Sequence, residues 1–397
     1  MNLEWLVIGG GIHGVHLAAR LLGETTVAPD RLRIVDPGEQ LLSRWRSCTA
    51  TTGMTYLRSP GVHHLDLSPW SLERFAGKRK KRKSRCFTAP YNRPTLDLFN
   101  SHCDHVMETF GLADLHIQDR ADTCLVDDDG VVVRLSSGQE VRAENLVLAI
   151  GAGERPAWPA WAPRDSGCVT HIFQPGFEGP RDVAQRVAVV GGGISACQIA
   201  LRLLDEGHRV QIVARHDLRE HQFDSDSGWL GPKNMARFER ETDVDRRREI
   251  ITEARHRGSV PPEVRREIRR AILHERLGWH EGEVVAFSSD HEGVTLTLTT
   301  DAELQVDQVL LATGFAANRP GGAMVDALID SAALPCAVCG YPVVDSALRW
   351  HPRVYVSGPL AELELGPVSR NIAGARRAAD RLIASLSQRA DDSRKAS

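Results

Sequence analysis

The sequence predicts an α/β protein built from two Rossmann-like dinucleotide-binding domains, the second of which carries a helical insertion. Three observations support this fold class. A strand, a glycine-rich turn, a helix and a second strand begin the chain, and the same order recurs near its middle. A charged, helix-prone segment follows the second copy. The chain has 397 residues, more than one ordinary hydrophobic core accommodates.

The first unit lies at the start of the chain. Its hydrophobic pattern predicts a buried strand, a helix and a second strand, at residues 3–9, 13–22 and 31–36. Gly9, Gly11 and Gly14 follow the first strand with the spacing GxGxxG, in which missing side chains let the backbone approach a pyrophosphate at the helix N-terminus. Asp36 ends the second strand, where a ribose-binding carboxylate is expected. The alternative, a tight turn without a ligand, is disfavoured by this ordered succession.

The second copy has the same order of elements. It predicts a strand, a helix and a further strand, at residues 186–190, 194–206 and 209–214. Its turn reads GGGISA at residues 191–196, and its last strand is followed by Arg215 where the first copy has aspartate. A cation there suits the 2′-phosphate of NADPH, so NADPH is favoured over NADH. The alternative is that Arg215 is an ordinary surface arginine.

Each unit supplies its own set of predicted cofactor contacts. Those of the first domain are Gly9, Gly10, Gly11, His13, Gly14, Asp36, Trp45, Met54, Gly151 and Gly358. Those of the second domain are Gly191, Gly192, Gly193, Ser195, Arg215, Thr313 and Gly314.

Prolines and charged residues divide the chain into segments. A linker rich in proline follows residue 155, and the helical insertion covers about residues 222–277. Further strands are predicted at residues 130–134, 141–150, 294–299, 308–312, 341–345 and 353–356, and a last helix at 371–386. We expect a discontinuous first domain at residues 1–165 and 316–389, a second domain at 178–315 and a frayed polar tail at 390–397.

Composition argues against several classes of partner. The formal charge of −3 gives no strong field for nucleic acid or an anionic membrane. No apolar stretch is long enough to span a bilayer and no basic leader precedes the first strand, which predicts a cytoplasmic protein. The eight cysteines are too sparse for a disulfide scaffold, and no metal site is predicted.

Two local patterns allow more than one interpretation. The basic run at residues 78–83 resembles a nucleic-acid or targeting patch, but no aromatic residues accompany it, so a solvated loop is favoured. Cys336 and Cys339 form C-x-x-C, which suggests a redox dithiol or half of a zinc site. Their position after Gly314, outside the second domain, argues against the thioredoxin-reductase arrangement.

Three short strings resemble the two-dinucleotide flavoproteins as a group. LAIG at residues 148–151 and LATGF at 311–315 resemble the segments that close the two units, and YVSGP at 355–359 resembles the last strand of the FAD domain. The resemblance implies that the first site binds FAD. The aspartate that often follows the glycine of that last strand is absent, which speaks against a standard disulfide reductase. The final helix would direct its positive end at the flavin.

Within that group the chain resembles the single-component N-hydroxylating flavin monooxygenases, the ornithine and lysine N-hydroxylases. The likeness rests on GMTYLRSP at residues 53–60 with SPWSL at 68–72, on the insertion from residue 224 to 260, and on GCVTH at 167–171. The last string matches the G-x-x-x-H part of an interdomain motif. The motif's phenylalanine and tryptophan would fall at Asp165 and Pro175, so the chain resembles a divergent branch.

This resemblance implies an enzyme in which NADPH reduces FAD, the reduced flavin captures O2 as a C4a-hydroperoxide, and a heteroatom of the substrate takes the distal oxygen. The substrate would be a small amine or amino-acid-like molecule, held uncharged in a desolvated pocket. Arg58 is the candidate for clamping a carboxylate, and His63 and His64 are the candidates for accepting a proton. The alternative for the two histidines is a structural role. Weaker candidates are His221, Asp224 and Asp226.

Two other functions stay open at this point. An NADPH:acceptor flavin oxidoreductase would leave the flavin edge open, whereas a monooxygenase needs a closed substrate cavity between the insertion and the flavin. A flavin-bound sensor or partner-binding protein would keep the fold without turnover. The charged insertion could also mediate self-association into a homo-oligomer.

Overall fold

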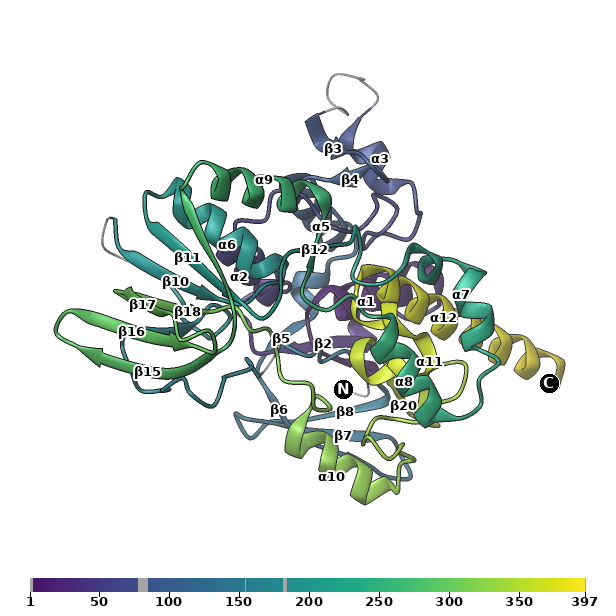
Figure 1. The fold of residues 1–397 in the computed structure, drawn as a ribbon. Coiled ribbons are helices and arrows are strands. Elements are labelled where there is room, and N and C mark those ends of the chain that lie inside the picture. The colour runs from purple at the N-terminus through teal and green to yellow at the C-terminus, as the bar shows by residue number, and fades with distance from the viewer. Residues whose placement is uncertain (1–2, 78–84, 154, 181–183, 397) are drawn as a thin grey trace.

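Two α/β units, each built around a mainly parallel sheet, make up the structure (Figure 1). The structure is a computed structural model that describes residues 3–77, 85–153, 155–180 and 184–396. The basic run at residues 78–83 therefore lies outside the described residues. The predicted fold class, two Rossmann-like units with a helical insertion, is confirmed. Within the described ranges, no helix has both the length and the apolar character needed to cross a membrane.

The first sheet is centred on β1 (Leu3–Ile8), whose residues apart from the half-buried Glu4 are apolar and buried. Its other strands are β2 (Leu32–Asp36), β5 (His116–Gln118), β6 (Ala121–Val126), β7 (Val131–Leu135), β8 (Glu140–Leu148), β19 (Arg349–His351) and β20 (Val354–Val356). They run in the order β19, β20, β8, β1, β2 and β5, and the hairpin of β6 and β7 joins through β8. Parallel pairing of β1 with both β2 and β8 brings their C-terminal ends to the same edge.

The C-terminal part of the chain completes this first sheet. Strand β20 pairs in parallel with β8, and helix α12 (Ile372–Ala396) packs against α1 (Ile12–Glu24). Helix α12 continues beyond Leu386, where the sequence predicts its end. Both the glycine-turn helix and the final helix thus lie on one face of the sheet (Figure 1).

The second sheet has the order β14, β11, β10, β18 and β9. Its strands are β9 (Val169–His171), β10 (Arg186–Val190), β11 (Arg209–Ala214), β14 (Leu277–Glu281) and β18 (Gln308–Leu311), with α6 (Ile194–Asp205) packed against β11. A three-stranded antiparallel sheet, β15 (Val284–Asp290), β16 (Gly293–Leu298) and β17 (Glu303–Val306), extends from this unit. β9 contributes the edge strand that contains the end of the GCVTH string.

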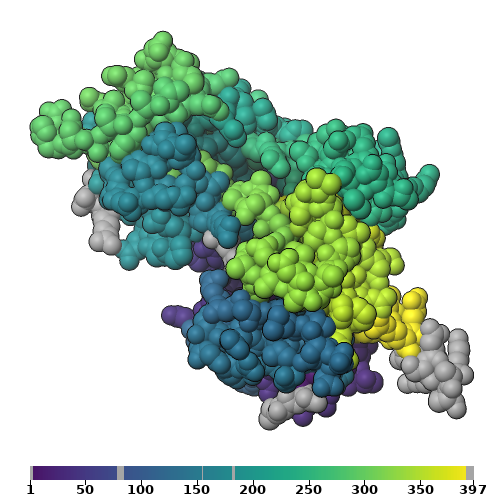
Figure 2. All heavy atoms as spheres, turned by 90° about the horizontal axis from the view of Figure 1, so that it is seen from below, coloured from purple at the N-terminus to yellow at the C-terminus, as the bar shows by residue number. Residues whose placement is uncertain are grey.

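The helical insertion divides between the two units. It contains η3 (Ser227–Leu230), α7 (Pro232–Phe238), α8 (Val244–Ala254) and α9 (Pro262–Leu273), with short strands β12 (Arg219–Glu220) and β13 (Ser259–Val260). Helix α9 packs against α6 of the second unit, whereas α8 packs against α11 (Glu362–Leu365). Figure 2 shows the teal-green α7 and α8 region lying against the lime-coloured segment that precedes α12.

The remaining elements connect these parts. They are η1 (Pro29–Arg31), α2 (Ser43–Thr52), α3 (Ser71–Ala76), β3 (Phe87–Thr88), β4 (Arg93–Pro94), α5 (Leu96–Thr109), η2 (Leu112–Leu115), α10 (Gly322–Ala332), η4 (Gly358–Ala361) and η5 (Pro367–Arg370). The predicted strand at residues 341–345 is wrong. Pro342 lacks an N–H, and the segment makes an isolated bridge with Cys336 instead of a ladder.

A fully buried carboxylate, that of Glu362, joins the insertion to the C-terminal segment. It accepts from Arg248 in the middle of α8, from Arg255 just after the end of α8, and from Arg370 at the end of η5. Burial alone raises the pKa of Glu362, but hydrogen bonding and the positive charges of Arg370, Arg255 and Arg248 outweigh it and lower the pKa to about 2.

We expect Glu362→Gln to destabilise the protein by about 3 kcal/mol or more at pH 7, because it leaves three partly buried guanidinium groups without their buried anion. With a pKa of about 2 against an ordinary 4.5, the carboxylate stabilises the fold fully above pH 4.5 and loses that contribution as the pH falls towards 2. Denaturant unfolding of wild type and variant should therefore converge at low pH. Glu249→Gln is the matched control, since its ion pair with Arg246 is exposed.

Candidate functional site

The first glycine turn leaves open space where a phosphate would approach. A Cβ added at Gly9, which has a φ of +109°, would lie 2.4 Å from the carbonyl oxygen of Ala149. One added at Gly14 would lie 1.8 Å from the carbonyl oxygen of Gly9, so both glycines are needed for close packing. A Cβ at Gly11, the N-cap of α1, would meet nothing within 4 Å. This turn therefore fits the pyrophosphate of FAD.

Polar contacts fix the residues around this turn. The two carboxylate oxygens of Asp36 accept from the backbone N–H groups of Gly10 at 2.7 Å and Gly38 at 2.8 Å. This places the carboxylate beside the turn, as ribose binding requires. The ring of His13 shares a 2.8 Å hydrogen bond with Ser357 Oγ at the end of β20, and burial lowers the pKa of His13 to about 4.

The other predicted FAD contacts lie around the same domain. Trp45, in α2, donates from Nε1 to Asn100 Oδ1 at 3.0 Å, and both Trp45 and Met54 pack against the hydrophobic core. Gly151 follows β8 with a φ of +67°, and Gly358 follows β20 with a φ of +65° beside the His13 ring. Both adopt the left-handed conformation that favours glycine.

The second glycine turn is packed between β18 and the insertion. A Cβ at Gly191, whose φ is +145°, would lie 2.5 Å from the carbonyl oxygen of Ala312. One at Gly193, the N-cap of α6, would lie 3.5 Å from the Cα of Gly258. The insertion therefore reaches the second turn through Gly258, a contact that sequence reasoning missed.

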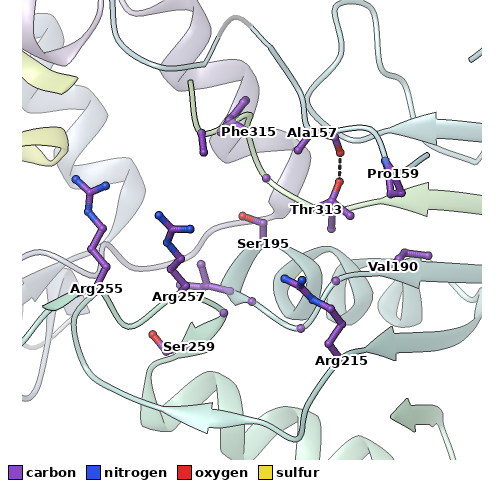
Figure 3. A pocket seen from close by; sticks show the side chains of 18 of the residues that line it. Ala157, Pro159, Val190, Ser195, Arg215, Arg255, Arg257, Ser259, Thr313 and Phe315 are labelled. Atoms are coloured by element: carbon purple, nitrogen blue, oxygen red, sulfur yellow. Dashed lines mark hydrogen bonds between the residues drawn. The ribbon is translucent and has the colours of Figure 1, made fainter. Parts of the chain in front are cut away.

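A cavity of about 1040 Å³ opens in front of this turn. It brings together predicted residues from three parts of the chain: Arg58, Gly191, Gly192, Gly193, Ser195, Arg215, Thr313 and Gly314. Figure 3 shows Ser195, Arg215, Arg255 and Arg257 around it, and Thr313 Oγ1 donating to the carbonyl oxygen of Ala157 at 2.5 Å. Trp158, Trp161 and Phe315 supply apolar surface to the same cavity.

Arg215 stands at the end of β11, as predicted, with its side chain 77% exposed and 4.0 Å from Glu283. A neighbouring cavity of about 300 Å³ is lined by Arg215, His216, Arg219, Arg257 and Gly258. Four basic side chains around one small cavity suit a phosphate group. Sequence reasoning found Arg215 from its place after a strand, but Arg257 comes from the distant insertion and carries no comparable signal.

Arg58 lines the main cavity, and its role as a carboxylate clamp stays a prediction. Its guanidinium donates to the carbonyl oxygens of His221, Gln222 and Phe223 at 2.7–2.9 Å, and to Ser259 Oγ at 2.8 Å. Arg58 therefore ties the first domain to the loop that enters the insertion.

The two adjacent histidines differ in their surroundings. His64 is fully buried, its Nδ1 accepts from the N–H of Asp66 at 3.2 Å, and its Nε2 lies 3.1 Å from the carbonyl oxygen of Pro69. Both ring nitrogens are thus occupied, which favours the structural alternative for His64, while its proton-accepting role stays a prediction. Burial, together with Arg376 and Arg377, lowers the pKa of His63 to about 4.

The weaker candidates are dispersed. Asp224 lines the main cavity, the His221 ring stacks on His256 with centroids 3.6 Å apart, and Asp226 caps the N-terminus of η3. Cys336 and Cys339 are both exposed, and Cys339 lines the main cavity. Sequence reasoning missed Arg248, Arg255, Tyr341 and Arg370, which also line it.

Comparisons with known proteins agree with this geometry. A family model described as FAD-NAD(P)-binding matches residues 6–153, and one described as pyridine nucleotide-disulphide oxidoreductase matches residues 80–256. The chain has the two-dinucleotide-binding flavoprotein fold. These matches confirm the predicted FAD- and NAD(P)-binding units. A search of curated protein sequences finds no significant match.

Several solved structures share the whole fold at low sequence identity. An ornithine N-hydroxylase of Kutzneria sp. 744, solved with reduced FAD, NADP+ and L-ornithine, is 18% identical with a TM-score of 0.78, over 98% of this chain and 100% of that one. The reduced ornithine hydroxylase of Pseudomonas aeruginosa is 17% identical with a TM-score of 0.74, over 98% and 99%. A bacillithiol disulfide reductase of Bacillus cereus is 15% identical with a TM-score of 0.64, over 98% and 100%.

We expect Gly11→Leu to abolish FAD retention without unfolding the chain, because the added side chain enters space that is open in the protein but needed by the pyrophosphate. The ratio of flavin to protein absorbance after purification measures this. Gly167→Leu is the control, since a Cβ there also meets nothing within 4 Å. A fully yellow Gly11→Leu protein would contradict the placement of FAD.

We also expect Arg215→Ala to weaken NADPH binding by about tenfold or more while leaving NADH binding nearly unchanged, because the predicted role of the arginine is to bind the 2′-phosphate that NADH lacks. Titration of each nucleotide against the protein measures both affinities. Arg209→Ala, at the exposed opposite end of β11, is the control. Equal weakening of the two nucleotides would remove the phosphate-binding role.

Proposed function

We propose that this protein is an FAD-dependent monooxygenase that uses NADPH and O2 to hydroxylate a small amine or another soft heteroatom. The observation that carries the proposal is the cavity of about 1040 Å³. It is lined by the second glycine turn, by the insertion, and by Thr313 and Gly314, where the chain leads back to the first domain. A substrate covered by the insertion would thus meet the nicotinamide site and the segment that returns to the first domain. The likeness in fold to ornithine hydroxylases over nearly the whole chain supports it.

The bound flavin supplies the oxygen chemistry, since reduced flavin activates O2 for transfer to a nucleophilic atom. The chain's own residues bind, orient and exclude water. Arg215 and Arg257 would hold the phosphates of NADPH, and Trp158, Trp161 and Phe315 would keep the cavity apolar near the return segment. Arg58 would keep the insertion closed over the cavity through its four hydrogen bonds.

The amine must be neutral when it reacts, so a proton has to leave it. Of the predicted histidines, His63 stays a candidate acceptor as an uncharged ring, but its lowered pKa, about 4, makes it a weak base, and it does not line the main cavity. Within the described part of the chain its ring makes no hydrogen bond that would occupy it. Desolvation in the cavity also favours the neutral amine.

An NADPH:acceptor flavin oxidoreductase without oxygen transfer is the second candidate. It is favoured by the exposed Cys339 at the cavity, by the match to the pyridine nucleotide-disulphide oxidoreductase model, and by the fold shared with the bacillithiol disulfide reductase. Both candidates require the reduction of flavin by NADPH, and they differ in whether the reduced flavin passes oxygen to a substrate or electrons to an acceptor.

The two candidates separate when the purified protein is reduced with NADPH without oxygen and then mixed rapidly with oxygenated buffer. For a monooxygenase, we expect a long-lived absorbance distinct from both oxidised and reduced flavin, because the covered cavity keeps water from the reacting centre. Immediate return to oxidised flavin would favour the oxidoreductase. Failure of NADPH to reduce the flavin would favour a flavin-bound sensor.

A further inference from the structure

The buried Glu362 carboxylate does not neutralise all of the positive charge of the three arginines around it. Oε1 accepts from Arg248 and, at 3.0 Å, from Arg370, while Oε2 accepts from Arg255 at 2.7 Å and from Arg370 at 2.8 Å. Two acceptor sites on each oxygen are therefore filled. Three guanidinium groups face one carboxylate, so these four side chains carry a net charge of +2.

Two of these arginines also have side-chain N–H groups that donate no hydrogen bond. Nε and Nη2 of Arg248 are buried and have no hydrogen-bond partner among the described residues. Arg255 donates from Nη2 to Glu362, and its side chain makes no other hydrogen bond within the ranges that the structure describes. Both side chains line the main cavity, where the Tyr341 ring lies 4.0 Å from the Arg248 guanidinium. Buried donors that stay unpaired are costly, so a ligand with acceptor oxygens would stabilise this arrangement.

The site for the dinucleotide phosphates lies elsewhere in the same cavity. Arg215, His216 and Arg257 surround the end of β11 and the second glycine turn. In Figure 3, Arg255 and Arg215 stand on opposite sides of the pocket, with Ser195 between them. Of the acids, Glu283 lies beside Arg215, while Asp224 faces Arg58 and Arg255 and reduces the positive charge at that end without cancelling it.

We propose that the insertion side of the cavity binds the carboxylate of an acidic substrate through Arg248 and Arg255, with Glu362 and Arg370 as positioning residues. This inference rests on the proposed function and specifies its substrate class: a small molecule that carries an oxidisable nitrogen or sulfur together with an acidic group. Two guanidinium forks match the paired oxygens of a carboxylate. A dibasic amino acid such as ornithine is a poorer fit, because it would bring its second positive charge towards the same arginines.

The test is calorimetric titration of the purified flavoprotein, saturated with NADP+, with succinate and L-glutamate as anionic probes and cadaverine as the cationic probe. We expect both anions to bind and cadaverine not to bind. Arg248→Lys and Arg255→Lys should each weaken succinate binding by about tenfold or more, because lysine keeps the charge towards Glu362 but loses the second donor. Arg246→Lys is the matched control, on the same helix and paired with exposed Glu249.

Three results would overturn the proposal: no preference for the anions over cadaverine, unchanged succinate binding in both variants, or succinate binding only when NADP+ is left out, which would assign the arginines to the dinucleotide. Thermal unfolding reports whether each variant folds. If neither does, phenylglyoxal modification of wild-type protein decides, since succinate should protect Arg248 and Arg255 but not Arg246. Succinate binding needs no turnover. A failure of flavin reduction or of the oxygen reaction would therefore contradict the proposed function, whereas these binding measurements test the acidic-substrate site separately.

Discussion

Burial of the Glu362 carboxylate among three arginines sets where the insertion lies against the first sheet. Glu362 is the first residue of α11, which follows β20 and η4 in the chain. Arg370 precedes α12, and Arg248 and Arg255 come from the insertion. Removing a carboxylate from water is unfavourable unless every partner is present, so this contact forms only when all three segments are in place. The Glu362 carboxylate therefore positions both the insertion, which lines the cavity, and the last strand of the FAD-binding unit.

Sequence alone predicts those parts of the site whose geometry is set locally. The first glycine turn is an example, because Gly14 packs against the backbone of Gly9 within one strand–turn–helix unit. Asp36 and Arg215 are likewise found from their position after a strand. The buried strands are predicted well because parallel strands covered on both faces read as continuous apolar runs.

The rest depends on contacts between residues far apart in the chain, which leave no periodic or spaced pattern. Gly258 meets the second glycine turn only after the insertion folds back, and Arg248 is one of three consecutive arginines that the sequence does not distinguish. His64 has the side chain of a proton acceptor, but its two backbone partners are not visible in the sequence. The strand expected at residues 341–345 is absent because an apolar run does not by itself specify a strand. These residues form an irregular segment whose apolar side chains pack in a hydrophobic cluster.

The pairing of β20 with β8 has a consequence for biosynthesis. The N-terminal unit emerges from the ribosome first, but its strands β19 and β20 and its covering helix α12 are translated last. Until then residues 146–148 of β8, beyond its pairing with β7, present an unpaired edge, and α1 presents an uncovered apolar face. The second unit, whose strands are contiguous between β9 and β18, can complete its sheet earlier. Vectorial synthesis thus favours a nascent chain in which the later unit matures before the earlier one.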